Sequence, residues 1–160
     1  MSERAKDLAE RLEAFNRDMM TFVEHLTEAE WRKICAWEDW GVGVTARHIG
    51  AGHYEGAVWL TKMIVSGEKL PELTGEQIDQ MANQHAREHA DCTKAEVLEI
   101  LRNNGDMLVA FAAGLGDADL DRTGYLAAIG SELSAQKLLE TLMLQSGGEH
   151  FANLKAAAAA

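Results

Sequence analysis

Apolar residues recur at alternating spacings of four and three along residues 4–26, and charged residues occupy most of the positions between them. This spacing places the apolar side chains on one stripe of an α-helix and the charges on its opposite face. The pattern therefore predicts a first long helix that packs on a core. Its stripe consists of Leu8, Leu12, Phe15, Met19, Phe22 and Leu26.

The same helical period appears in three later segments. Residues 44–66 are predicted to form the second helix. The third begins at the capping box Thr93-Lys-Ala-Glu96, whose side chains can satisfy free backbone amides, and runs to about Leu115. Either Ser131 or Ser134 can cap the fourth helix, which continues toward the end of the chain.

The segments between these helices are mostly polar. A second capping box, Thr27-Glu-Ala-Glu30, predicts a short helix that carries Trp31 and Ile34. Pro71 marks a long connection between the second and third helices, in which residues 76–90 are expected to be partly helical. The apolar contacts of that segment are expected from Ile78, Met81 and Ala82, and residues 122–130 are expected to be a loop.

Four long amphipathic helices with one extended connection predict an all-α four-helix bundle. Composition agrees, because runs typical of strands are missing and helix-forming residues are plentiful. We expect residues 1–155 to form a single domain and residues 156–160 to be an alanine-rich helical tail that frays.

The net charge of −11 excludes several classes of partner. It would repel nucleic acids and anionic membranes, whose binding depends on lysine and arginine. No apolar run is long enough for a membrane span, and the charged start lacks an apolar signal core. Cys35 and Cys92 have neither a metal-binding spacing nor a disulfide framework. We therefore expect a cytoplasmic protein whose partner is a small molecule.

A glycine-rich turn between Trp37 and Gly43 leads into the second helix. Its tryptophans either close one end of the core or line the mouth of a pocket. The second helix also contains Gly50, Gly52 and Gly56, each of which costs roughly 1 kcal/mol of helix propensity relative to alanine. Close approach of a neighbouring helix, or space for a ligand, would explain these glycines.

Two histidines suggest a metal site inside the bundle. His48 lies near the start of the second helix and His150 near the end of the fourth, so they meet if those helices are antiparallel neighbours. Neutral imidazole is a good ligand for zinc or nickel, and a catalytic ion needs three protein ligands. The position one turn before His150 would supply the third, but it holds Ser146, a poor metal ligand.

No nearby residue is expected to replace Ser146. His53 follows His48 by five residues, so in an α-helix it points away from it. Glu149 points about 100° away from His150 round the helix, and Glu55 lies two turns beyond His48. The other candidates for contacts to a ligand in the pocket are Trp40, Glu55 and Asn153.

Two further groups have a structural interpretation. His85 and His89 have a spacing that suits two zinc ligands on a helix, but their polar segment favours a solvated face. Cys92 directly precedes the helix cap at Thr93, which can lower the pKa of a thiol, although a structural cysteine is the better interpretation.

Four segments resemble the DinB-like family in order along the chain. They are Trp40-Gly-Val-Gly-Val-Thr-Ala-Arg-His48-Ile49, the middle segments Asp79–Asn83 and Glu96–Leu98, and Leu142–Leu154 with His150. The middle segments are most similar to the mycothiol-dependent maleylpyruvate isomerase side of that family. The resemblance implies a four-helix bundle, often a dimer, with a divalent metal held by one histidine of the second helix and two residues of the fourth. Carried over by position, the ligands are His48, Ser146 and His150.

The resemblance also implies a class of activity. Family members of known activity are thiol-dependent transferases or isomerases, so a metal-dependent enzyme with a low-molecular-weight thiol is one hypothesis. The alternative is a non-catalytic bundle that binds a small ligand or acts as a dimeric structural module, and Ser146 favours this alternative.

Overall fold

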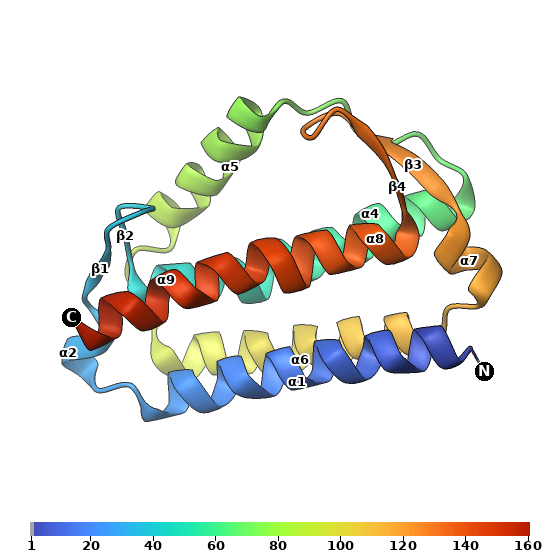
Figure 1. Ribbon diagram of the computed structural model, residues 1–160. Helices are drawn as coiled ribbons and strands as arrows, with labels where there is room; N and C mark the ends of the chain where they lie inside the picture. The colour runs from blue at the N-terminus through green and yellow to red at the C-terminus, as the bar shows by residue number, and fades with distance from the viewer. Residues whose placement is uncertain (1) are drawn as a thin grey trace.

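The computed structural model describes residues 2–160 and shows a bundle of four long helical segments (Figure 1). The bundle predicted from the sequence is confirmed. The second and fourth segments are each interrupted by a π-helix, in which hydrogen bonds join residues five apart. In chain order the segments are α1 (Glu3–His25); α3 (Val42–Arg47), η1 (His48–His53) and α4 (Tyr54–Ser66); α6 (Lys94–Ala113); and α8 (Ala135–Leu139), η2 (Glu140–Gly147) and α9 (Gly148–Ala159).

The helices pack as two antiparallel pairs, α1 beside α6 and the second segment beside the fourth (Figure 1). The apolar stripe of α1 supplies Leu8, Leu12 and Met19 to the core, where Leu101 and Leu108 of α6 are also fully buried. Side-chain caps begin the helices where the sequence places them. Thr93 forms the expected capping box, and Ser134 rather than Ser131 accepts the hydrogen bond that caps α8.

One helix of the long connection, α5 (Gly75–Glu88), stands away from the bundle (Figure 1). Only Ala86 of this helix is buried. The prediction that Ile78 and Met81 are its packing contacts is wrong in this respect, because both side chains remain exposed toward the space between α5 and the bundle. No helix in residues 2–160 is both long and apolar enough to cross a membrane.

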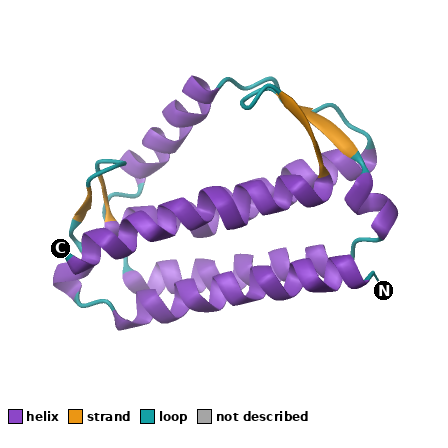
Figure 2. Cartoon of the chain, in the orientation of Figure 1, coloured by secondary structure: helices purple, strands orange, loops and turns teal. Residues whose placement is uncertain are grey.

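Two antiparallel hairpins complete the fold (Figure 2). Residues 122–130, expected to be a loop, contain the strand β3 (Thr123–Leu126). The short helix α2 (Glu28–Trp31) ends before Ile34, which lies in a strand instead. Strands of two to four residues are too short to show an alternating pattern. The remaining elements are α2 (Glu28–Trp31), β1 (Ile34–Cys35), β2 (Trp40–Gly41), α7 (Asp117–Asp121), β3 (Thr123–Leu126) and β4 (Ser131–Ser134).

Candidate metal centre

The π-helix η1 brings His48 and His53 together. The backbone amide of Tyr54 donates to the carbonyl of Ile49, five residues earlier, which shows that the turn is wider than in an α-helix. A wider turn returns residues five apart to the same side, and the two imidazole centroids lie 4.9 Å apart. The prediction that His53 points away from His48 is therefore wrong, because it assumed α-helical geometry.

The hydrogen bonds of η1 also involve the third helix. In an α-helix the Tyr54 amide would donate to the carbonyl of Gly50. Here that carbonyl accepts a hydrogen bond of 2.9 Å from Nδ2 of Asn104 on α6. Gly50 permits this close approach, since an added Cβ would lie 3.0 Å from a methyl group of Leu101. Gly52 makes room for His48, whose Nδ1 would lie 3.1 Å from an added Cβ.

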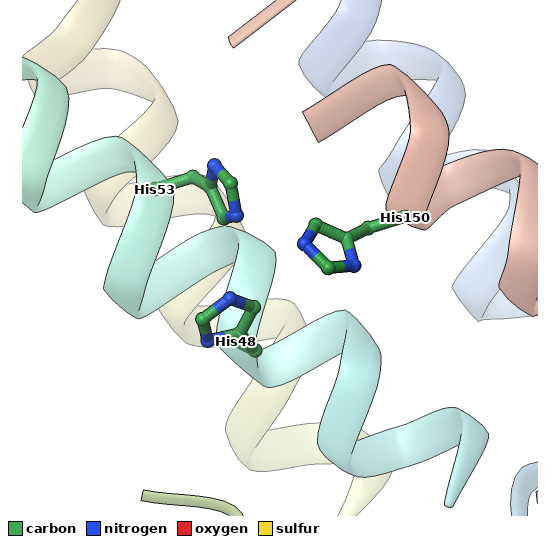
Figure 3. A group of neighbouring side chains, drawn as sticks. All are labelled: His48, His53 and His150. Carbon is green, nitrogen blue, oxygen red and sulfur yellow. The ribbon is translucent and has the colours of Figure 1, made fainter. Parts of the chain in front are cut away.

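His150 of α9 completes a cluster of three imidazoles (Figure 3). Its ring centroid lies 5.2 Å from that of His48 and 5.0 Å from that of His53. One ligand nitrogen from each residue can be chosen so that all three lie within 4.8 Å of one another. The second and fourth helical segments are thus antiparallel neighbours whose histidines meet, as expected.

Hydrogen bonds fix which ring nitrogen carries the proton in two of the three residues. Nδ1 of His53 lies 2.9 Å from the carbonyl oxygen of Leu142 in η2. Nδ1 of His150 lies 2.9 Å from Oε1 of Glu38, which also accepts a hydrogen bond of 2.8 Å from Nδ2 of Asn153. A carbonyl and a carboxylate only accept, so each Nδ1 donates its proton and each Nε2 keeps a free lone pair.

The environment keeps two of these histidines neutral at physiological pH. Burial, and then the neighbouring histidines, lower the pKa of His48 to about 3. Burial also lowers the pKa of His53 to about 4, although its hydrogen bond to Leu142 opposes the shift. Neutral imidazoles repel a cation much less than imidazolium ions do and offer lone pairs to it.

The residues fit a divalent transition metal. Three imidazoles form a donor set typical of catalytic zinc, and imidazole also suits nickel. Metal–nitrogen bonds of about 2.0–2.1 Å in a tetrahedral site would place the nitrogens roughly 3.3 Å apart. The distance between any two of the three ligand nitrogens would therefore have to shorten by about 1.5 Å at most. Glu38 supplies the outer carboxylate that often orients a ligating histidine.

A cleft of about 720 Å³ opens above the three histidines, between the bundle and α5. Ser146 and Trp40 line it. The Trp40 ring meets His48 edge to face at a centroid distance of 5.0 Å, and its Nε1 donates to Asn83. Trp37 also lines the cleft, so both tryptophans belong to a pocket mouth, whereas Trp31 is buried in the core.

Two of the pocket candidates lie elsewhere. Asn153 holds Glu38 beneath His150 and is not part of the cleft wall. Glu55 lines a separate depression beside Arg47 and accepts a hydrogen bond of 3.1 Å from Asn104. Neither residue is among those that line the cleft within residues 2–160.

His85 and His89 do not form a free solvated face, because both are only partly exposed. His85 lies at the edge of the cleft, 6.1 Å from His48 between ring centroids. Its Nε2 accepts a hydrogen bond of 2.9 Å from Arg47, so that nitrogen is engaged and His85 is a rim residue. Burial raises the pKa of Cys92 to about 11, which makes this thiol a poor nucleophile. This supports the interpretation of a structural cysteine over the alternative of a lowered pKa.

The comparisons with known proteins agree with this architecture. The family model of the DinB superfamily matches residues 11–144. The solved structure described as "YfiT from Bacillus subtilis is a probable metal-dependent hydrolase with an unusual four-helix bundle topology" is similar to this chain with a TM-score of 0.77 and 15% sequence identity. The match covers 98% of this chain and 87% of that one.

At that identity, the likeness to YfiT shows a shared fold. A search of curated proteins finds no significant match. The family match spans the π-helix with His48 and His53 and ends shortly before His150. The chain belongs to the DinB superfamily.

Proposed function

We propose that the protein is a divalent-metal-dependent enzyme in which His48, His53 and His150 hold the ion. The observation that carries the proposal is the convergence of three half-buried imidazoles at the floor of a cleft. Ser146 is then a wall residue, and His53 takes the place of the second ligand that other family members supply from the fourth helix. The site is complete without Ser146.

The reaction class that fits best is attack on a small organic substrate by an activated water or a low-molecular-weight thiol. His48, His53 and His150 would hold the zinc or nickel ion, which would supply a Lewis acid that lowers the pKa of a water or thiol. Hydrolysis corresponds to the activity that the description of YfiT names as probable. Thiol-dependent transfer or isomerisation corresponds to the activity implied by the sequence resemblance.

The protein's own groups have definite roles in this proposal. Glu38 holds the proton of His150 on Nδ1, and the Leu142 carbonyl does the same for His53, so both rings present Nε2. Trp40 packs against His48 and limits its rotation. The cleft walls hold the substrate and exclude water around it.

Elemental analysis tests the metal site directly. The untagged protein is stripped with a chelator, dialysed against zinc or nickel, and measured beside the variants His48→Gln, His53→Gln and His150→Gln. We expect about one ion per chain in the wild type and loss of the ion in each variant. Ser146→Ala is the matched control and should keep its ion. A wild type without metal, or a His53→Gln variant with full metal, would contradict the proposal.

The activity is tested with the metal-loaded protein on activated esters and on electrophiles, with and without added low-molecular-weight thiols. Turnover that needs both the metal and a thiol indicates a transferase or isomerase, whereas turnover with water alone indicates a hydrolase.

Glu38→Ala should lower metal affinity roughly 10–100-fold, because His150 loses its orienting partner.

The size and lining of the cleft favour a second candidate, a non-catalytic bundle that binds a small ligand. A volume near 720 Å³ is in the range that holds small organic molecules. This function predicts bound organic density or a ligand-induced rise in Tm in a protein that contains no metal.

A further inference from the structure

The walls of the cleft contain an unusual share of the chain's exposed apolar side chains. Eight large apolar residues are strongly exposed within residues 2–160, and four of them line this one cleft. Single exposed apolar residues are ordinary, but several gathered around one hollow indicate a binding surface. The four are Trp37, 82% exposed, Met81, 60% exposed, Trp59, 53% exposed, and Ile78, 40% exposed.

These side chains come from separate elements that face one another across the cleft. Trp37 lies in the turn of the β1–β2 hairpin, Trp59 lies on α4, and Ile78 and Met81 lie on α5. The helix α5 has a single buried residue, so its apolar side chains are not held in place by the bundle core. The histidines lie at the floor between these walls.

The charged side chains that line the cleft are acidic. It includes the carboxylates Glu38 and Asp79, and none of the lining residues in the described range 2–160 is a lysine or arginine. The guanidinium of Arg47 lies behind the rim residue His85, to which it donates, and is paired with Glu96 at 3.5 Å. The chain as a whole carries a net charge of −11, so an anion meets repulsion on approach as well as in the cleft.

We infer that the cleft binds a small molecule with an aromatic or aliphatic body that is uncharged or cationic, and that it discriminates against anionic molecules. The apolar walls take the body of the molecule and the carboxylates exclude negative charge. We also place the reacting end of the molecule over the three histidines, and only this part of the inference rests on the proposed function. The discrimination applies to the metal-free cleft, because a divalent ion held by the histidines would add positive charge at its floor.

Isothermal titration calorimetry on metal-stripped protein tests the inference without depending on the metal. Three probes share one body and differ in charge: 2-naphthylmethanol, 2-naphthylmethylamine and 2-naphthoate. We expect the neutral and cationic probes to bind and the anionic probe to bind at least about tenfold more weakly. Equal or tighter binding of 2-naphthoate, or no binding of the other two, would overturn the inference.

Variants then locate the binding. Met81→Ser should weaken 2-naphthylmethanol about fivefold, because it removes one apolar wall. Met107→Ser is the matched control, since Met107 is also exposed but lies outside the cleft, and it should bind as the wild type does. Asp79→Lys should strengthen binding of 2-naphthoate about tenfold by placing a cation at the wall. Equal effects of the two methionine variants would refute the location.

A second copy of the chain is the competing occupant. Sedimentation of the wild type and of Met81→Ser distinguishes it from a small molecule. If the wild type is a dimer, the variant is a monomer and no naphthyl probe binds, the walls of the cleft are a subunit interface and the inference is wrong. The metal measurement is separate from all these outcomes. If the protein binds no metal but still binds 2-naphthylmethanol more tightly than 2-naphthoate, the proposal of a metal-dependent enzyme is wrong and the inference about the cleft is retained.

Discussion

Acid should destabilise the metal-free protein through His48 and His53. Both pKa values are lowered on folding, to about 3 and about 4, whereas an exposed imidazole in the unfolded chain has a pKa near 6.5. Between these values the unfolded state binds more protons than the folded state. The stability that these neutral histidines contribute is therefore fully present above about pH 6.5 and falls as the pH falls toward 3–4.

The size of the effect at pH 5 depends mainly on the unfolded state. This pH lies about 1.5 units below the pKa of an imidazole in the unfolded chain. Protonation of the unfolded state therefore lowers the free energy of unfolding by about 2 kcal/mol per histidine, at about 1.36 kcal/mol per pH unit. The folded pKa values lie below pH 5, so a change of a few tenths in either alters this figure little. Together the two residues account for at most about 4 kcal/mol, a large part of a typical domain's stability.

Urea unfolding of chelator-treated protein at pH 7.5 and pH 5 measures this loss. With a slope of about 2 kcal/mol per M, each histidine shifts the midpoint between the two pH values by about 1 M. His48→Gln and His53→Gln should each reduce the shift by that amount, while Ser146→Ala, which removes no titrating group, should keep it. Carboxylates affect all variants alike. Equal pH shifts in the wild type and both histidine variants would refute the argument.

Two further substitutions test the support of the site. Tyr54→Phe removes the donor of the buried 2.8 Å hydrogen bond to Oδ1 of Asn16, so we expect the free energy of unfolding to fall by about 1–3 kcal/mol, measured by urea unfolding at pH 7.5. Asn104→Ala removes the donor to the π-helix carbonyl and should weaken zinc about tenfold in a chelator competition, because His53 is held less well. The exposed neighbour Asn103→Ala should leave zinc affinity unchanged, and an equal loss in both would count against this role.

The bundle was predictable because its helices are long. The 23 residues of α1 repeat the apolar spacing several times, and the buried residues Leu8, Leu12 and Met19 follow it. The β3–β4 hairpin was not predictable, since four residues contain only two alternations and the pairing Leu126 with Ser131 depends on the turn between them. The same limit applies to the two-residue strands around Trp37.

Half of the candidate site was predictable for a similar reason. His48 and His150 were found because their positions depend only on which helices are neighbours. His53 is not predicted as a ligand, because a period of 3.6 residues per turn points it away from His48 and η1 does not follow that period. Glu38 lies 112 residues from His150 in sequence, and nothing in its surroundings marks it as the partner of a histidine.

The two π-helices explain how a cluster of three histidines persists with a serine at position 146. In η1 the wider turn brings His53 beside His48, and the Gly50 carbonyl accepts from Asn104. In η2 the Leu142 carbonyl accepts from Nδ1 of His53, so the second π-helix orients the ligand that the first one positions. Each irregular turn thus presents a backbone acceptor to a side chain that supports the cluster. π-Turns are rare and less stable than a regular α-helix. Their occurrence in both histidine-bearing segments is therefore better explained by selection for this cluster than by helix stability.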